Sequence, residues 1–151
     1  MLIRPITKEE RLQSAQLLTI ESGDLTISAA DDAIHCDYTL QIGAEGTDGP
    51  AISITDCDEG LEAAALHVAS GDIRIRASDD CLNAANSDLS GFDFSMDISG
   101  GTISAYTTDG DGFDSNGSMT ITGGTPPENP DGGTPPERPD NASEPPEPGN
   151  L

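Results

Sequence analysis

The sequence predicts an all-β protein: a short right-handed parallel β-helix, or solenoid, with a short N-terminal helix-like cap and a disordered Pro-rich C-terminal tail. Three observations predict this fold. A phrase of two acidic residues followed by small, apolar and polar residues occurs four times, short stretches of alternating apolar and polar residues accompany it, and no segment between copies is long enough for a crossover helix. Repeats of about 20 to 50 residues are typical of stacked units that are too small to bury an apolar face alone.

The first segment, residues 1–17, is predicted to be a cap or leader. Thr7 is placed to act as a helix N-cap, and Glu10 follows three residues later, as in a capping box, which predicts a short helix over Met1–Gln16. The segment lacks the basic, then apolar, then small order of a secretory signal peptide. Since no apolar run in the chain reaches the roughly 20 residues of a membrane span, we expect no membrane insertion.

The repeats occupy residues 18–125. The second acidic residues of the four copies are Asp32, Glu59, Asp80 and Asp111, so the copies are spaced by 27, 21 and 31 residues. Loops rich in turn residues explain the unequal spacing, and one extra residue before Asp111 predicts a bulge. Apolar residues that should point into the solenoid are Leu25, Ile27, Ile34, Leu40, Ile42, Ile52, Ile54, Leu61, Ile73, Ile75, Leu82, Ile103, Ala105, Phe113, Met119 and Ile121.

The third segment, residues 126–151, differs in composition from the repeats. The sequence Gly-Gly-Thr-Pro-Pro-Glu occurs at residues 123–128 and again at 132–137. Because proline cannot donate a hydrogen bond to a sheet, the segment is predicted to be an acidic, disordered tail or linker.

Composition excludes one class of partner. The chain has 28 Asp and Glu against 6 Lys and Arg, a formal net charge of −22. Nucleic-acid binding depends on Lys and Arg that neutralise phosphates, so we expect no nucleic acid as a partner. Cys36, Cys57 and Cys81 have no metal-binding spacing and are expected to be small buried residues. His35 and His67 have no recurring partner and are expected to face solvent or cap a turn.

The acidic pairs carry the main chemical hypothesis. Stacked copies would lie about 4.8 Å apart, and like charges that face each other on neighbouring strands destabilise a sheet. Bound Ca²⁺ would offset this repulsion, because it binds six to eight oxygens from carboxylates, carbonyls and water. An Asx turn explains any single Asp more simply, whereas the whole set favours calcium. The candidate metal ligands are Asp31, Asp32, Asp58, Glu59, Asp79, Asp80, Asp109, Asp111, Asp114 and Asn116.

Arg74 and Arg76 are the only basic residues of the repeated region, and their alternation with Ile73 and Ile75 predicts that both point outward. They are candidate ligand-binding residues, because a guanidinium matches a sugar carboxylate in bidentate fashion. They are also the residues that a calcium-assisted polysaccharide lyase would need beside its metal. The alternative is that they only relieve the excess negative charge of the chain.

Three segments resemble a known family. They are residues 25–36, a similar copy at residues 73–84, and Asp-Gly-Asp-Gly-Phe-Asp-Ser-Asn-Gly at residues 109–117 together with the strand-like residues 119–124 that follow it. The chain resembles the clostridial-type carbohydrate-binding β-helix family over about Ser22 to Thr125. That resemblance implies an exported or cell-surface parallel β-helix that binds acidic polysaccharide of the polygalacturonate type, holds structural Ca²⁺ and has no established hydrolytic activity. It places the family's acidic pairs and its late corner on the candidate metal ligands given above.

The sequence therefore favours a non-catalytic, calcium-assisted module that binds acidic polysaccharide. Two alternatives stay open: a polysaccharide lyase or paired-carboxylate glycosidase on the same scaffold, and a structural or adhesive surface protein that calcium stiffens. The resemblance implies an extracellular or cell-surface location, although no signal peptide is visible. Because the end coils of a solenoid need caps, end-to-end self-association is a further expectation.

Overall fold

The computed structural model describes residues 12–14 and 16–124 of the chain, which form twelve β-strands and no helix. The strands are β1 (Leu12–Ser14), β2 (Leu17–Ile20), β3 (Asp24–Ser28), β4 (Ile34–Ile42), β5 (Ala51–Asp56), β6 (Leu61–Val68), β7 (Asp72–Ala77), β8 (Leu82–Ala84), β9 (Ser95–Ile98), β10 (Thr102–Thr107), β11 (Phe113–Ser115) and β12 (Ser118–Ile121). The strands pair only in parallel with strands of neighbouring coils. This arrangement confirms the predicted parallel β-helix.

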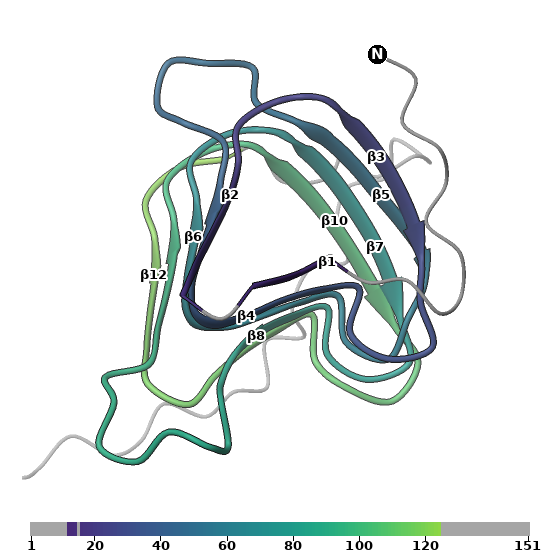
Figure 1. Cartoon of the computed structure of the whole chain (residues 1–151). Helices are drawn as coiled ribbons and strands as arrows, with labels where there is room; N and C mark the ends of the chain where they lie inside the picture. The colour runs from purple at the N-terminus through teal and green to yellow at the C-terminus, as the bar shows by residue number, and fades with distance from the viewer. Residues whose placement is uncertain (1–11, 15, 125–151) are drawn as a thin grey trace, which may run out of the picture.

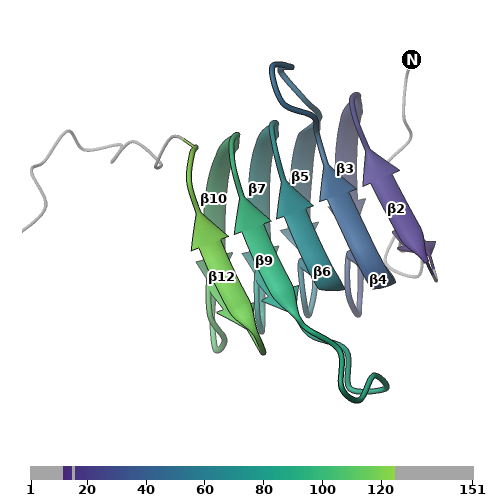
Figure 2. The same ribbon diagram turned by 90° about the vertical axis from the view of Figure 1, so that its left-hand side faces the viewer.

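The coils enclose a roughly triangular cross-section with three walls (Figure 1). The right wall is the sheet β3, β5, β7 and β10. The longer strands β4 and β6 bend, so that their first parts join β1, β8 and β11 in the lower wall and their second parts join β2, β9 and β12 in the left wall. In Figure 1 the chain climbs the left wall and descends the right wall while later coils recede, so the solenoid is right-handed, and Figure 2 shows the left wall face on.

Inward side chains stack in columns along the solenoid axis. Ile34, Leu61 and Leu82 occupy one column on the lower wall, and each is fully buried. Fully burying a Leu or Ile side chain stabilises the fold by about 1.5 to 3 kcal/mol, so these columns supply much of the driving force for coil stacking. Other predicted inward residues are buried as expected, namely Ile27, Leu40, Ile42, Ile52, Ile54, Ile73 and Ile75, while Leu25 is partly buried against them.

The last coil keeps the predicted register but is left partly uncovered. Phe113, Met119 and Ile121 continue the inward columns of Leu82, Met96 and Ile98, but they are 37%, 42% and 59% exposed. Ile103 and Ala105 are only partly buried. The physical reason is that no further coil covers this end among the described residues. The prediction that Phe113, Met119 and Ile121 take inward positions is therefore confirmed by their register, and the open end of the solenoid leaves them exposed.

The prediction of a helix over Met1–Gln16 is wrong at Leu12–Ser14. Residues Leu12–Ser14 form β1, in which Leu12 pairs with Ile34 of β4. Strand pairing thus begins before residue 18, because the edge of the next coil offers backbone partners that a helix would leave unpaired. Residues 1–11, with Thr7 and Glu10, lie outside the described residues, as does the Pro-rich segment 126–151.

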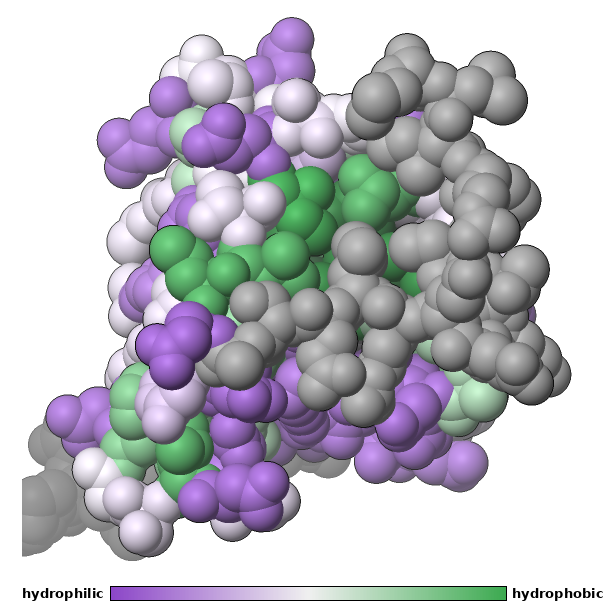
Figure 3. Space-filling view, in the orientation of Figure 1, coloured by the Kyte–Doolittle hydropathy of each residue, from purple (hydrophilic) through white to green (hydrophobic). Residues whose placement is uncertain are grey.

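The predicted loops leave the solenoid at two different corners. Residues 43–50 join the left wall to the right wall, and residues 85–94 join the lower wall to the left wall and project away from the coils (Figure 1). Seen down the axis, apolar side chains gather in the middle of the end face, and hydrophilic ones lie above, to the left of and below them (Figure 3). Insertions therefore lengthen corners without disturbing the stacked walls, as expected for a solenoid.

Candidate functional site

The repeated acidic pairs lie at the corner where the right wall turns into the lower wall. This acidic corner comprises Asp31, Asp32, Asp58, Glu59, Asp79, Asp80, Asp109 and Asp111. Backbone hydrogen bonds hold its first three copies in register: Asp58 N donates to Asp31 O at 3.2 Å, and Asp79 N donates to Asp58 O at 3.0 Å. The structure therefore brings the predicted pairs together as a column of stacked turns.

The fourth copy contains the extra residue that the sequence indicates. Thr102 pairs with Asp72, an offset of 30, whereas Phe113 pairs with Leu82, an offset of 31. Asp109 N consequently donates to Ser78 O, and a Cβ added to Gly110 would lie 2.4 Å from the carbonyl carbon of Asp79. Gly110, rather than Asp109, thus continues the first acidic column.

The second acidic column is continuous and uses protein donors to offset part of its charge. Asp111 N donates to Asp80 Oδ1 at 2.7 Å, and Asn83 Nδ2 donates to Glu59 Oε2 at 3.0 Å. In the first column, Ser78 Oγ donates to Asp58 Oδ1 at 2.7 Å. These donors reduce the mutual repulsion of the stacked carboxylates without any bound ion.

Negative charge nevertheless accumulates at the corner. Asp80 raises the pKa of the exposed carboxyl of Asp79, and desolvation and the charges of Asp58, Asp109 and Asp111 act in the same direction. A raised pKa means that each additional negative charge at this position is unfavourable. A row of carboxylates in this state attracts cations from solution.

Asp114 and Asn116 lie away from the acidic corner. Asp114 belongs to β11 on the lower wall, where it pairs with Asn83, and Asn116 N donates to Ala84 O at 3.1 Å. The late sequence 109–117 is thus spread over a corner and a wall and does not converge on one point.

Arg74 and Arg76 point outward from β7 on the right wall, as predicted. Arg74 Nη2 lies 3.3 Å from Asp72 Oδ2, and the Arg76 guanidinium lies 4.6 Å from the centroid of the Tyr106 ring. A shallow hollow of about 330 Å³ lies beside Arg74 and is lined in part by Thr26 and Ser53. Neither arginine contact involves a carboxylate of the acidic corner, so these residues and the corner form separate features.

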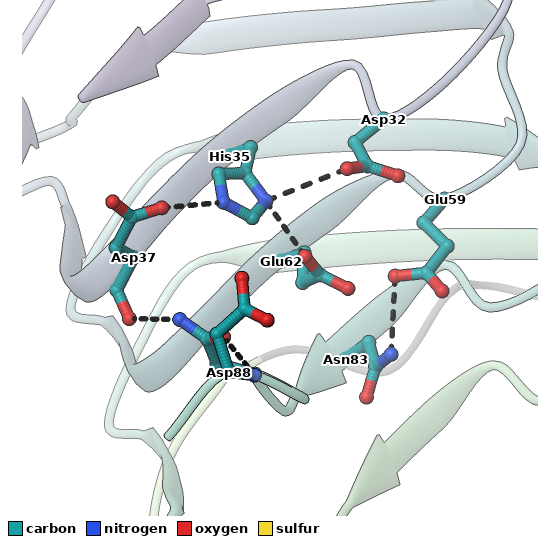
Figure 4. A network of polar contacts seen from close by, with 8 residues as sticks. Asp32, His35, Asp37, Glu59, Glu62, Asn83 and Asp88 are labelled. Carbon is teal, nitrogen blue, oxygen red and sulfur yellow. Dashed lines mark hydrogen bonds and ion pairs between the residues drawn. The ribbon is translucent and has the colours of Figure 1, made fainter. Parts of the chain in front are cut away.

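The structure also shows a site that sequence reasoning missed, centred on His35 (Figure 4). His35 Nε2 lies 2.9 Å from Asp37 Oδ1, and its Nδ1 lies 2.6 Å from Glu62 Oε1 and 3.4 Å from Asp32 Oδ2. The imidazole is only 15% exposed. Glu62 comes from the next coil, where it pairs directly with His35 across β4 and β6. The expectation that His35 faces solvent or caps a turn is therefore replaced by a half-buried network.

This environment changes the protonation of two groups. Contacts with Asp32 and then Glu62 raise the pKa of His35 to about 10, against the opposing effect of burial. Burial and the neighbouring Glu62 raise the pKa of Glu59 to about 8, although Asn83 favours its charged form. At neutral pH the imidazole of His35 is therefore positively charged, and the neighbouring Glu59 is mostly protonated.

One signal in the sequence could have found this cluster. The residues three positions after the second acid of each copy are His35, Glu62, Asn83 and Asp114, and they form one outward column on the lower wall. Their types differ, so the column is invisible to a search for recurring His or Cys. Aligning the copies by register rather than by residue type would have placed Glu62 against His35.

Comparison of the chain with protein-family models, with curated proteins and with solved structures found no match. The resemblance to a carbohydrate-binding family therefore stays a prediction. Among the described residues, no helix has the length and apolar character needed to cross a membrane.

Proposed function

We propose that this protein is a non-catalytic module that binds an acidic, polygalacturonate-like polysaccharide with the help of Ca²⁺ at the acidic corner. The proposal includes an extracellular or cell-surface location, where such a polysaccharide would be met. The observation that carries it is the in-register stacking of acidic turns along one edge of the solenoid.

The spacing of the turns suits calcium. Ca²⁺ binds oxygens at about 2.3 to 2.6 Å, so two oxygens on one ion lie at most about 5 Å apart. Neighbouring coils are about 4.8 Å apart, so one ion can take carboxylates from two successive turns. Asp58 and Asp79, from consecutive coils and both exposed, are the pair best placed to do so.

Charge explains why the ion would matter for the polysaccharide. A chain of net charge −22 repels a polymer of uronate residues unless a cation lies between them. Ca²⁺ on an exposed edge keeps open coordination positions for ligand oxygens. A shallow hollow of about 220 Å³ lies beside the corner and could accommodate a sugar ring. Its lining includes Asp56, Asp58 and Ser78.

The test is binding of the full chain to polygalacturonate with and without Ca²⁺. The double variant Asp79→Asn/Asp111→Asn removes two corner carboxylates, and Asp48→Asn/Asp93→Asn makes the same charge change on exposed loop residues. We expect the corner variant to lose calcium-dependent binding by at least about tenfold and the loop variant to keep it. Binding that is absent with Ca²⁺, or equal in both variants, contradicts the proposal.

A glycosidase is the second candidate, and one observation favours it. Burial and the hydrogen bond with Glu62 raise the pKa of Glu59 to about 8, and a carboxyl of raised pKa is what the general acid of glycoside hydrolysis requires. Release of reducing ends from polygalacturonate that Glu59→Gln abolishes would support the enzyme. If the native chain releases no sugar while it binds the polymer, the binding module stands.

A further inference from the structure

The side chains of Asp32, His35 and Glu62 converge on the outer face of the lower wall. Each offers one ligand atom, and these atoms all lie within 4.8 Å of one another. Asp32 and His35 come from one coil, and Glu62 reaches them from the next coil. Their side chains are 15 to 17% exposed, so the cluster is set into the wall and differs from the open carboxylates of the corner.

His35 is oriented as a metal ligand would be. Its Nε2 faces Asp37 Oδ1 at 2.9 Å, which directs Nδ1 toward Asp32 and Glu62. A carboxylate on the far nitrogen is the usual arrangement that fixes the ring of a metal-bound histidine. Asp37 is itself anchored, because Asn86 Nδ2 donates to its backbone carbonyl at 2.9 Å. The ring is therefore held on one side by a carboxylate of its own strand, and Asn86 of the 85–94 loop anchors that residue in turn.

The Nδ1 atom is a second, separate indication. It is buried, and although two carboxylate oxygens lie near it, neither is aligned for a regular hydrogen bond. The ion pair with Glu62 at 2.6 Å compensates this atom while the ring is protonated, and once the proton leaves, a metal ion is a partner that Nδ1 and both carboxylates can share. Three carboxylates also face one imidazole ring, so negative charge remains in excess around it and favours exchange of the single proton on Nδ1 for a divalent cation, with release of that proton.

We propose that Asp32, His35 and Glu62 form a binding site for a divalent transition-metal ion, with Zn²⁺ as the best match. Ligands on tetrahedral Zn²⁺ at about 2.0 to 2.2 Å are roughly 3.3 to 3.5 Å apart. The 3.4 Å between His35 Nδ1 and Asp32 Oδ2 already fits this separation. The 2.6 Å to Glu62 Oε1 has to lengthen by less than about 1 Å, which the Glu62 side chain can provide by rotation.

The ligand set selects against calcium at this point. One imidazole nitrogen and two carboxylates suit Zn²⁺ and its neighbours in the first transition series, whereas Ca²⁺ takes only oxygens and needs six or more of them. Three protein ligands leave a fourth position for water or for a ligand oxygen. This site therefore goes beyond the proposed calcium corner, with which it shares only Asp32.

The experiment is a Zn²⁺ titration of the full chain by calorimetry, with reducing agent to keep Cys36, Cys57 and Cys81 as thiols. We expect one ion per chain. His35→Gln and Glu62→Gln should each weaken Zn²⁺ binding by at least about tenfold, and Asp37→Asn, which only orients the ring, by about tenfold. The control is His67→Gln, since His67 faces a single carboxylate, Asp97, at 3.3 Å.

Imidazole ¹⁵N spectra of the native chain give a readout that does not depend on variants folding. Zn²⁺ should shift the Nδ1 resonance of His35 and leave both nitrogens of His67 in place. Equal binding by native and His35→Gln chains, a response at His67 instead, or no saturable Zn²⁺ binding overturns the proposal. Absence of calcium-dependent polygalacturonate binding contradicts the corner proposal and leaves Zn²⁺ binding standing, so the two proposals fail separately.

Discussion

Replacing His35 with Gln tests whether the cluster on the lower wall holds a charged imidazole in the folded chain. In metal-free solution the native contacts raise the pKa of His35 from 6.5 to about 10. The folded state then binds a proton more tightly than the unfolded state. This preference stabilises the fold fully below about pH 6.5 and is lost as the pH rises through that value toward about 10.

The structure sets the size of this effect. A shift from 6.5 to about 10, at about 1.4 kcal/mol per pKa unit, gives an upper limit of roughly 5 kcal/mol. Asp37 is 40% exposed, so solvent screens part of the attraction. We therefore expect the native chain to lose about 2 kcal/mol relative to His35→Gln between pH 6 and pH 10.

The assay is urea unfolding of both chains across this range, with a chelator and a reducing agent present. Titration of the cysteine thiols contributes to both chains and cancels in the difference. His67→Gln is the matched control, because the same substitution there removes a more exposed imidazole with one acidic neighbour. A free-energy difference between native and His35→Gln that stays flat from pH 6 to pH 10 would refute the reasoning.

Three further predictions concern the fold and its polar face. Leu66→Ala removes a fully buried side chain and should cost about 2 to 5 kcal/mol in urea unfolding, while Met119→Ala at the open end should cost less than about 1 kcal/mol. Gly60→Ala would put a Cβ 2.3 Å from a backbone oxygen of the next coil and should lower the free energy of unfolding by about 2 kcal/mol or more. Gly112→Ala should be tolerated, because the nearest atom to its added Cβ is 3.8 Å away. Equal melting temperatures of these two variants would contradict the coil stacking. Because the pKa of Glu59 is raised from 4.5 to about 8, the native chain should lose stability as the pH rises from 4.5 to 8. Above pH 8, Glu59→Gln should be about 1 kcal/mol more stable than the native chain. A variant that is less stable than the native chain there would count against a raised pKa of Glu59.

Much of the fold could be predicted from the sequence because a solenoid is locally repetitive. Each coil of alternating residues predicts its own inward side chains, and Ile52, Ile54 and Leu61 are buried as the alternation indicates. The stacked corner follows from the same periodicity. Exposure of Met119 and Ile121 did not follow, since it depends on what lies over the last coil rather than on the residues within it.

Non-local contacts limited the prediction elsewhere. The capping-box pattern of the first residues is a local signal, and it fails at Leu12–Ser14 because these residues pair with β4, more than 20 residues later. His35 is a similar case. Its partner Glu62 lies in the next coil, so only the register of the lower wall brings the two together.

The acidic corner as a calcium site is most directly tested by diffraction from crystals of the full chain grown in Ca²⁺, using the anomalous signal of the ion. The account predicts an ion at the corner with carboxylate oxygens of two successive coils, Asp58 and Asp79 first among them, at about 2.3 to 2.6 Å. An empty corner at saturating Ca²⁺, or ions bound only elsewhere on the chain, would contradict it.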